Sequence, residues 1–220
     1  MNKIKLINKL RQRKYRDELG LFVVEGDKLI NEIPNNLLEF IINVDEIGER
    51  EFNKLSELTT PQTKIAVCRK PNFDSNIQRS EHKLKIVLDR IQDPNNVGAI
   101  LRSTAAAGLH DVILLEGTAD PFNSKSIRAS MGAIFHLNLI TMTEEDLIQS
   151  KLDLLAAHMR GIDYRKFEVS SPSALIFGNE GQGVSKSLLE VSAKVTIPIQ
   201  KVESLNVNAA AAILIFHFAS

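Results

Sequence analysis

The feature that most constrains the fold of this chain is a regular alternation of short apolar runs with segments of helical periodicity, which begins at residue 84. The apolar runs, which are expected to be strands, lie at 85–91, 112–115, 135–140, 152–157, 174–177 and 194–199. Helices are expected at 97–107, 124–131, 144–150 and 185–191, and from Leu205 onward. Such alternation predicts an α/β fold with a parallel sheet and helices on both faces, and ligands of such sheets bind at the carboxyl ends of the strands.

The first part of the chain predicts a smaller α/β unit. Residues 2–18 have the apolar spacing of one amphipathic helix, which Gly20 ends. Strands are expected at 21–24, 40–44 and 64–67, and helices at 27–33 and 49–58. The segment 71–80 is polar and rich in turn-forming residues, as is typical of a linker. We therefore place a boundary near its end, between domains at 1–82 and 83–220.

Composition excludes several classes of protein. Hydrophobic residues make up 44% and charged residues 25% of the chain, which is close to the average for globular proteins. A single cysteine, Cys68, cannot form an intramolecular disulfide or a cysteine-based zinc site, which favours a reducing compartment and predicts a cytoplasmic protein. The longest apolar run, Ala209 to Phe216, is far shorter than the roughly 18 residues of a membrane span. No membrane partner and no secretory signal are expected.

The basic residues are concentrated at the N-terminus. The formal net charge of the chain is zero, so its overall electrostatics do not indicate a nucleic-acid partner. Seven basic residues nevertheless lie within residues 1–20, where they face two acids. This run either binds a polyanion such as RNA or forms a solvated helix face that acids elsewhere compensate. The candidate RNA-binding residues are Lys9, Arg11, Arg13, Lys14 and Arg16.

Several common catalytic motifs are missing. The segment 178–183 has the spacing of the two P-loop glycines, but the lysine that would contact phosphates is absent. Its glycine order also differs from that of the dinucleotide-binding fingerprint. The chain has no G-x-S-x-G nucleophile motif. Its five histidines are isolated and lack paired metal-ligand spacing, so no metal site is predicted.

Three polar segments at the predicted strand ends carry the remaining candidates. In D-P-N-N-V-G-A-I-L-R-S, which begins at Asp93, Arg102 lies inside an otherwise apolar helix, where an arginine needs a partner. In F-G-N-E-G-Q-G, which begins at Phe177, three glycines flank Glu180, so that the backbone can approach a ligand closely. In S-L-N-V, which begins at Ser204, polar residues open the last helix. An ion pair, a turn and a helix cap are the structural alternatives.

In this order, the three segments closely resemble the motifs of the SpoU branch of the SPOUT methyltransferases, which methylate ribose 2′-oxygens of RNA with S-adenosylmethionine. The resemblance covers residues 84–220 and includes R-A-S-M-G-A-I-F-H-L from Arg128. The segment K-Y-R-D-E-L-G-L-F-V-V-E-G from Lys14 resembles the small ribosomal-protein-like substrate-binding domain of many ribosomal-RNA members. The resemblance implies an S-adenosylmethionine-dependent RNA (ribose-2′-O-)methyltransferase that acts on ribosomal RNA. A transfer-RNA methyltransferase and a non-catalytic RNA-binding protein are the alternatives.

The resemblance also implies structural features that the residue pattern alone does not predict. The SPOUT methyltransferase domain would contain a C-terminal trefoil knot and would form a homodimer through its last helix. The implied cofactor-binding residues are Ile176, Gly178, Ile197 and Leu205. The implied catalytic residues are Asn96, Arg102, Glu180, Ser204 and Asn206.

Arg102 is the residue that members of the family are proposed to use for activating the ribose hydroxyl. Because the pKa of arginine lies above about 12, we expect a cation that stabilises the developing alkoxide and holds the neighbouring phosphate, rather than a base. Asn96 and Glu180 would orient its guanidinium, and Ser204 and Asn206 would hold the ribose. Between Ile197 and Ser204 many relatives carry a glycine that is absent here, which predicts a shorter and tighter loop.

Overall fold

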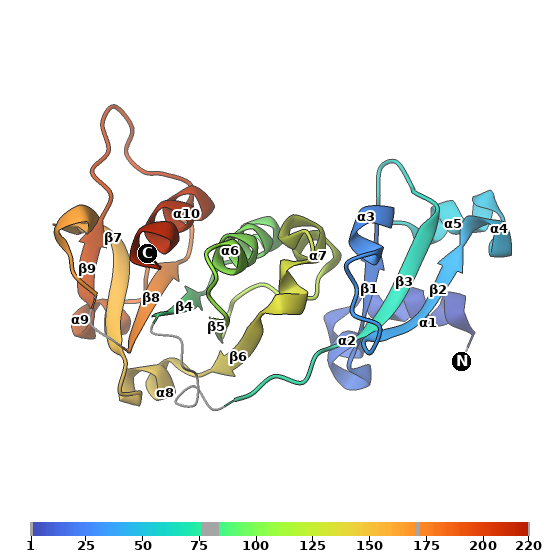
Figure 1. Ribbon diagram of the computed structural model, residues 1–220, viewed down its shortest axis with the longest axis horizontal. Coiled ribbons are helices and arrows are strands. Elements are labelled where there is room, and N and C mark those ends of the chain that lie inside the picture. Colours follow the sequence, from blue (N-terminus) through green and yellow to red (C-terminus); the bar gives the residue numbers. More distant parts are fainter. Residues whose placement is uncertain (1, 76–83, 170–171, 220) are drawn as a thin grey trace.

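The computed structural model describes residues 2–75, 84–169 and 172–219, and these residues form two β-sheets (Figure 1). The smaller sheet is antiparallel, with strand order β1-β3-β2. Its strands are β1 (Leu21–Glu25), β2 (Leu38–Asn43) and β3 (Lys64–Arg69). The helices of this half are α1 (Lys3–Leu10), α2 (Arg13–Leu19), α3 (Asp27–Ile30), α4 (Val44–Ile47) and α5 (Glu49–Leu55).

The single N-terminal helix predicted over residues 2–18 is wrong, because the chain breaks between α1 and α2. Gln12 has extended backbone angles, with φ −93° and ψ 132°. The side chain of Arg16 folds back, and its Nη1 donates to the carbonyl oxygens of Leu10 (2.7 Å) and Arg11 (2.8 Å). These are carbonyls that the end of a helix leaves without an intrahelical partner, so Arg16 stabilises the break. Gly20 ends α2 as predicted, with φ 63°.

The larger sheet has the order β6-β5-β4-β8-β7-β9, and all its strands are parallel. Its strands are β4 (Leu84–Asp89), β5 (Asp111–Leu115), β6 (Asn138–Met142), β7 (Asp153–Asp163), β8 (Ser173–Gly178) and β9 (Ala193–Thr196). The helices are α6 (Pro94–Ala106), α7 (Ser124–Ser130), α8 (Glu144–Gln149), α9 (Lys186–Val191) and α10 (Val207–Phe218). Short 3₁₀ helices lie at Ala133–His136 and Tyr164–Lys166. The predicted fold class is confirmed, although the first part of the strand expected at 135–140 is helical.

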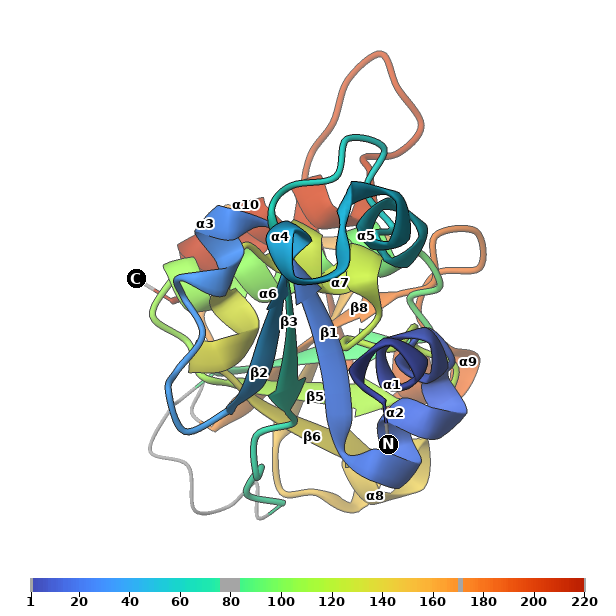
Figure 2. The same ribbon diagram turned by 90° about the vertical axis from the view of Figure 1, so that its right-hand side faces the viewer.

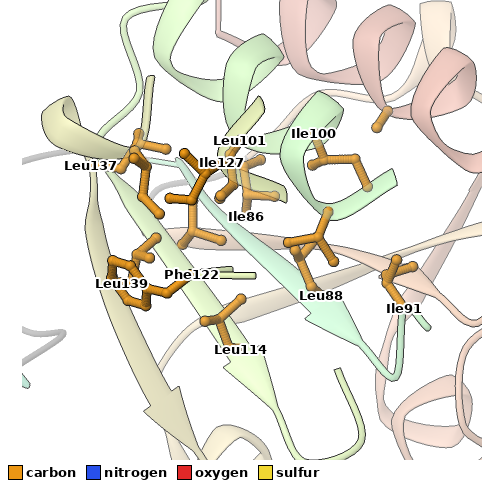
Figure 3. Close-up of a cluster of buried hydrophobic side chains, with 14 of the residues drawn as sticks. Ile86, Leu88, Ile91, Ile100, Leu101, Leu114, Phe122, Ile127, Leu137 and Leu139 are labelled. Atoms are coloured by element: carbon orange, nitrogen blue, oxygen red, sulfur yellow. The ribbon is translucent and has the colours of Figure 1, made fainter. Parts of the chain in front are cut away.

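Helices cover both faces of this sheet because alternate residues of each strand point to opposite sides. In β4, Ile86 and Leu88 pack with side chains of α6, α7 and α10, as Figure 3 shows for part of this core. Val87 lies between them in sequence and packs on the opposite face with Leu147 of α8 and Leu188 of α9. The carboxyl ends of the strands therefore open between two helical layers.

The small sheet packs against the C-terminal half and shares a core with it. One face of β3 presents Val67 to α1 and α5, whereas Cys68 on the other face belongs to the same hydrophobic cluster as the large sheet. Phe22 of β1 is fully buried, and its ring centroid lies 4.9 Å from that of Phe122 and 6.3 Å from that of Phe135. Figure 2 shows β1 and the N-terminal helices in front of the C-terminal sheet.

An ion pair joins the two halves beside this apolar contact. Arg16 donates from Nε and Nη2 to Oδ2 of Asp120, at 2.8 Å and 2.6 Å. The Arg16 and Asp120 side chains are only 5% and 8% exposed. The predicted domain boundary at residue 82, and the second half of the predicted linker, lie outside the described residues. The division into 1–82 and 83–220 stays a prediction, and so does the knot.

Candidate active site

The site is formed where β4 and β8 end side by side, with Asp89 opposite Gly178 in the strand register. The loop after β4 leads into α6, whose N-cap Asp93 accepts from the backbone N–H of Asn95. The loop after β8 carries the glycine-rich segment. Helix α10 begins nearby, with the Asn206 side chain as its N-cap. The three segments that the sequence singled out are therefore brought together.

Glu180 holds these segments to one another. Its carboxylate accepts hydrogen bonds from Nδ2 of Asn96 (2.8 Å) and from the backbone N–H groups of Gln92 (3.2 Å) and Asp93 (3.3 Å). Partial burial raises the pKa of Glu180, but the hydrogen bonds from Asn96 and the backbone outweigh it, so that its pKa lies below the usual value. Glu180 is therefore ionised at neutral pH.

Asn96 connects this carboxylate to the last helix. It is buried at the start of α6, and its Oδ1 accepts from Nδ2 of Asn208 at 3.3 Å. Sequence analysis missed Asn208, although it lies two residues after Asn206 in the third motif. The chain of side chains from Asn208 through Asn96 to Glu180 fixes the relative positions of α10, α6 and the glycine-rich loop.

Arg102 lies apart from this chain. It is exposed on α6 and has no hydrogen bond or ion pair within the part of the chain that the structure describes. The expected partner for this arginine and its orientation by Asn96 and Glu180 are therefore wrong. Asn96 precedes Arg102 by six residues, about 9 Å along a helix. The alanine-rich surface that suggested burial faces solvent at this position, so the guanidinium needs no internal partner.

A cavity of about 670 Å³ adjoins Glu180 at the carboxyl ends of the strands. This volume is in the range of small-molecule sites in proteins. Its lining includes three of the predicted cofactor-binding residues and two of the predicted catalytic residues, which are Gly178, Ile197 and Leu205, and Ser204 and Asn206. Its apolar walls come from Ala157, Phe177, Val195 and Leu214.

Ile176 does not line the cavity. It is fully buried and packs in the core on the α8 and α9 side of the sheet. Its neighbour Phe177 points to the opposite face and lines the cavity instead, as the two-residue period of a strand requires. Its side chain therefore does not contact the cavity, and its assignment to the cofactor site, which was made through backbone groups, stays a prediction.

Gly178 is needed for the turn of the glycine-rich loop. A Cβ atom at this position would collide with the backbone of Gly183 and Val184. The loop folds back here, and the N–H of Gly183 donates to the carbonyl oxygen of Asn179 at 2.8 Å. The absence of a side chain at Gly178 thus shapes the cavity wall by letting two backbone segments touch.

The missing glycine predicted a shorter and tighter loop between β9 and α10 than in relatives; the structure shows an extended, exposed loop, and its length relative to relatives stays a prediction. Residues 200–205 are all exposed, and Figure 1 shows this loop projecting from the sheet beside α10. Lys201 has φ 65°, in the left-handed region that glycine adopts most easily. Lys201 therefore takes the conformation for which a glycine is favoured, and the loop stays open at the cavity.

The basic N-terminal side chains divide into two groups. Lys9, Arg13 and Lys14 are exposed on α1 and α2. Arg16 is only 4% exposed and pairs with Asp120, so its prediction as an RNA contact is wrong. Arg11 is partly engaged, because its Nη2 donates to the carbonyl oxygens of residues 54 and 55 in α5.

Two negative observations belong to the described residues alone. In residues 2–75, 84–169 and 172–219, no group of three or more histidine, cysteine or acidic side chains is arranged to hold a metal ion. Within the same ranges, every helix is too short or too polar to cross a membrane.

Known proteins share both the sequence and the fold. The model of the SpoU rRNA Methylase family matches residues 83–216, and that of the MRM3-like substrate binding domain matches residues 1–40. A Bacillus subtilis (strain 168) protein named 23S rRNA (guanosine(2553)-2'-O)-methyltransferase RlmP is 34% identical over 240 residues, which cover 98% of this chain and 95% of that protein. A putative RNA methyltransferase of the TrmH family from Porphyromonas gingivalis superposes with a TM-score of 0.86 at 31% identity, covering 99% of this chain and 96% of that one.

A structure described as AdoMet bound rRNA methyltransferase from Sinorhizobium meliloti also has a TM-score of 0.86, at 29% identity, and covers 98% of this chain and 94% of that one. The fold and the cavity beside Glu180 thus define an S-adenosylmethionine-dependent RNA methyltransferase. The chain belongs to the SpoU rRNA methylase family, whose model spans more than half of it. The predictions of family, enzyme class and cofactor are confirmed, and the non-catalytic alternative is not supported.

Proposed function

We propose that this protein methylates a ribose 2′-hydroxyl of ribosomal RNA. The observation that carries the proposal is the hydrogen-bonded set of Asn208, Asn96 and Glu180 at the rim of a cavity of about 670 Å³. The similarity to the protein named RlmP, over nearly the full length of both chains, supports ribosomal RNA as the substrate and the 2′-oxygen as the methylated atom.

The residues of the cavity fit S-adenosylmethionine. Backbone groups of the loop that begins at Gly178 can approach the ligand closely, and Ile197 and Leu205 offer apolar contacts and further backbone groups. When bound, the cofactor supplies a methyl group on a positively charged sulfur. The apolar walls exclude water, which favours a reaction in which charge is dispersed.

The polar residues at the cavity hold the acceptor ribose. Asn206 uses its Oδ1 to accept from the backbone N–H of Asn208 at 2.9 Å, which leaves its Nδ2 to donate to a ribose oxygen. Ser204 lies two residues before Asn206, is exposed and lines the same cavity. The ionised Glu180 fixes Asn96 and the start of α6, so that the protein side of the site is preformed.

Arg102 acts on the RNA as a cation. Its guanidinium is exposed and need not break an internal ion pair before it contacts a phosphate. A bidentate contact of this kind positions the neighbouring phosphate and stabilises negative charge on the attacking oxygen. The ribose proton passes to water or to that phosphate, because arginine does not lose its own proton near neutral pH.

The exposed Lys9, Arg13 and Lys14 support capture of RNA by the N-terminal half, to which the substrate-binding family model also matches. The homodimer belongs to the same proposal: Ile213 and Phe216 of α10 are 38% and 50% exposed, which supports a self-associating face. The knot and the cytoplasmic location also stay part of the proposal, as implied by the resemblance and by the single cysteine.

The test is methyl transfer from labelled S-adenosylmethionine to purified ribosomal RNA and, separately, to purified transfer RNA. We expect labelled ribosomal RNA, with the methyl group mapped to one 2′-oxygen by nuclease digestion and mass spectrometry. Label on transfer RNA alone would replace the proposed substrate. Label on a base would overturn the assignment of the acceptor atom.

A further inference from the structure

Arg90, which follows β4 directly, contacts the glycine-rich loop with its side chain. Its Nη1 donates to Oε1 of Gln182 at 3.1 Å, and its Nη2 donates to the carbonyl oxygen of Gly183 at 3.3 Å. The same guanidinium is fixed from behind by Asp89, whose Oδ1 accepts from Nε at 2.8 Å and whose Oδ2 accepts from Nη2 at 3.1 Å. This planar two-point contact fixes the direction of the guanidinium toward the loop.

Asp89 is a rigid base for this contact. Its side chain is 1% exposed at the end of β4, and its Oδ2 also accepts from the backbone N–H of Ser185 at 2.7 Å. The hydrogen bond that the Arg90 guanidinium donates to Asp89 raises the pKa of Arg90, which therefore remains a cation. The Asp89 carboxylate thus binds the backbone at Ser185, just after the loop, and it contacts Gln182 and Gly183 of the loop through Arg90.

The backbone of Arg90 contacts the same loop through Asn179 and the segment after β5 through Thr118. Its carbonyl oxygen accepts from Nδ2 of Asn179 at 3.0 Å, and its N–H donates to Oγ1 of Thr118 at 3.1 Å. Its φ is 57°, in the left-handed region that residues other than glycine adopt only at an energetic cost. Such strain persists only where the surrounding contacts enforce it. The contacts of Arg90 with Asp89, Asn179 and Thr118 hold this backbone angle, and through Asn179 they also hold the loop that carries Glu180.

We propose that Arg90 is a positioning residue for methyl transfer, which holds the loop at 179–183 against the β4 end so that the cofactor cavity is formed and Glu180 is aligned with Asn96. This inference rests on the proposed role of Glu180. Arg90 itself does not line the cavity, whereas the loop residues it contacts do. Its effect is therefore expected on cofactor binding and on the chemical step, and not on RNA capture by the N-terminal half.

The test compares Arg90→Asn with Arg90→Lys and with Arg69→Asn in the full-length protein. Asparagine tolerates the left-handed backbone angle but removes the guanidinium. Lysine keeps the positive charge, but its ammonium group lacks the planar fork with which arginine contacts Asp89 at two points. Arg69→Asn is the matched control, because it removes an arginine whose ion pair with Glu39 lies in the small sheet, away from the cavity.

Affinity is measured by calorimetric titration with S-adenosylhomocysteine, and kcat and KM are measured with S-adenosylmethionine. For Arg90→Asn we expect about a tenfold weaker affinity, a higher KM for S-adenosylmethionine and a lower kcat, with RNA affinity within twofold of wild type. Arg90→Lys should recover part of the loss, and Arg69→Asn should behave as wild type. If Arg90→Asn fails to fold, Asp89→Asn with Arg90→Asn removes the unpaired buried charge and serves for the same titration.

A folded variant without the Arg90 guanidinium that binds S-adenosylhomocysteine within twofold of wild type would overturn the inference. An equal loss in Arg69→Asn would also overturn it, because the effect would then be general destabilisation. Failure of the wild-type protein to bind S-adenosylhomocysteine would instead contradict the proposed function, so the two failures are distinguishable.

Discussion

Replacing Arg16 by methionine is expected to destabilise the whole chain, because this side chain joins the two halves. Its guanidinium forms a buried ion pair with Asp120 and also donates to two carbonyls at the end of α1. Breaking a buried pair by removing one partner costs about 3–5 kcal/mol, since the other charge is left without a counterion. In a chain of this length that corresponds to a fall in Tm of roughly 6–20 °C.

The assay is urea unfolding followed by circular dichroism, with Arg13→Met as the matched control. Arg13 forms an exposed ion pair with Asp17 at 3.4 Å, and such pairs contribute at most about 1 kcal/mol. Arg16→Met combined with Asp120→Leu should recover much of the loss, because an apolar pair leaves no isolated charge. A free energy of unfolding for Arg16→Met equal to that of Arg13→Met would refute the reasoning, and would indicate that the two halves are not held by this contact.

Three further predictions concern the site. At a hundredfold excess over Kd, S-adenosylhomocysteine should stabilise the wild-type protein by about 2.7 kcal/mol. Gly178→Ala should abolish this stabilisation, because its Cβ would displace the loop at Gly183 and Val184. Thermal denaturation with and without the ligand measures the effect. Arg102→Ala should remove most methyl transfer in the labelled-RNA assay and leave the calorimetric affinity for S-adenosylhomocysteine intact, whereas near-wild-type activity in Arg102→Lys would contradict a bidentate role. Folding lowers the pKa of Glu180, so its carboxylate adds stability above its unfolded pKa, about 4.3, and this stability is lost as the pH falls through the folded pKa. Glu180→Gln should therefore weaken the dependence of Tm on pH in this acid range. An unchanged profile of Tm against pH would contradict the assignment.

The sequence predicted which segments form the site because that information is local. Each motif follows a strand, and parallel strands place their carboxyl ends at one edge, so that Glu180 and Asn96 meet. The direction of individual side chains was harder to predict. Ile176 is adjacent to a cavity-lining phenylalanine in sequence, but it points to the other face of the sheet. The resemblance placed Ile176 near the cofactor through backbone groups, and it does not specify the direction of the side chain.

Long-range partners account for the other errors. Arg16 belongs to a charge run that looks uniformly solvated, and only its pairing with Asp120, 104 residues away, shows that it is buried. For Arg102 the error was the opposite, because the sequence predicted a buried arginine and the structure shows an exposed one. The alanines around it resemble a buried helix, but α7 and α10 pack on other sides of α6 and leave the side of Arg102 open to solvent. Burial of a charged residue thus depends on contacts that periodicity alone does not specify.

The shared core determines how RNA capture should be tested. Deletion of residues 1–82 would remove the side chains that cover Phe122 and Phe135, so that loss of RNA binding could result from an exposed apolar surface. Alanine substitutions at the exposed Lys9, Arg13 and Lys14 leave that core intact.

If these side chains contact phosphates, each substitution should weaken binding about equally for all RNA sequences and reduce the slope of log affinity against log salt concentration by a little under one unit. Affinity for S-adenosylhomocysteine should stay unchanged, which is the internal control. An unaltered salt slope in the triple variant would mean that α1 and α2 do not capture the RNA. Because Arg16 of α2 pairs with Asp120 of the C-terminal half, these helices lie against that half, and the RNA would then have to reach the cavity across a different surface.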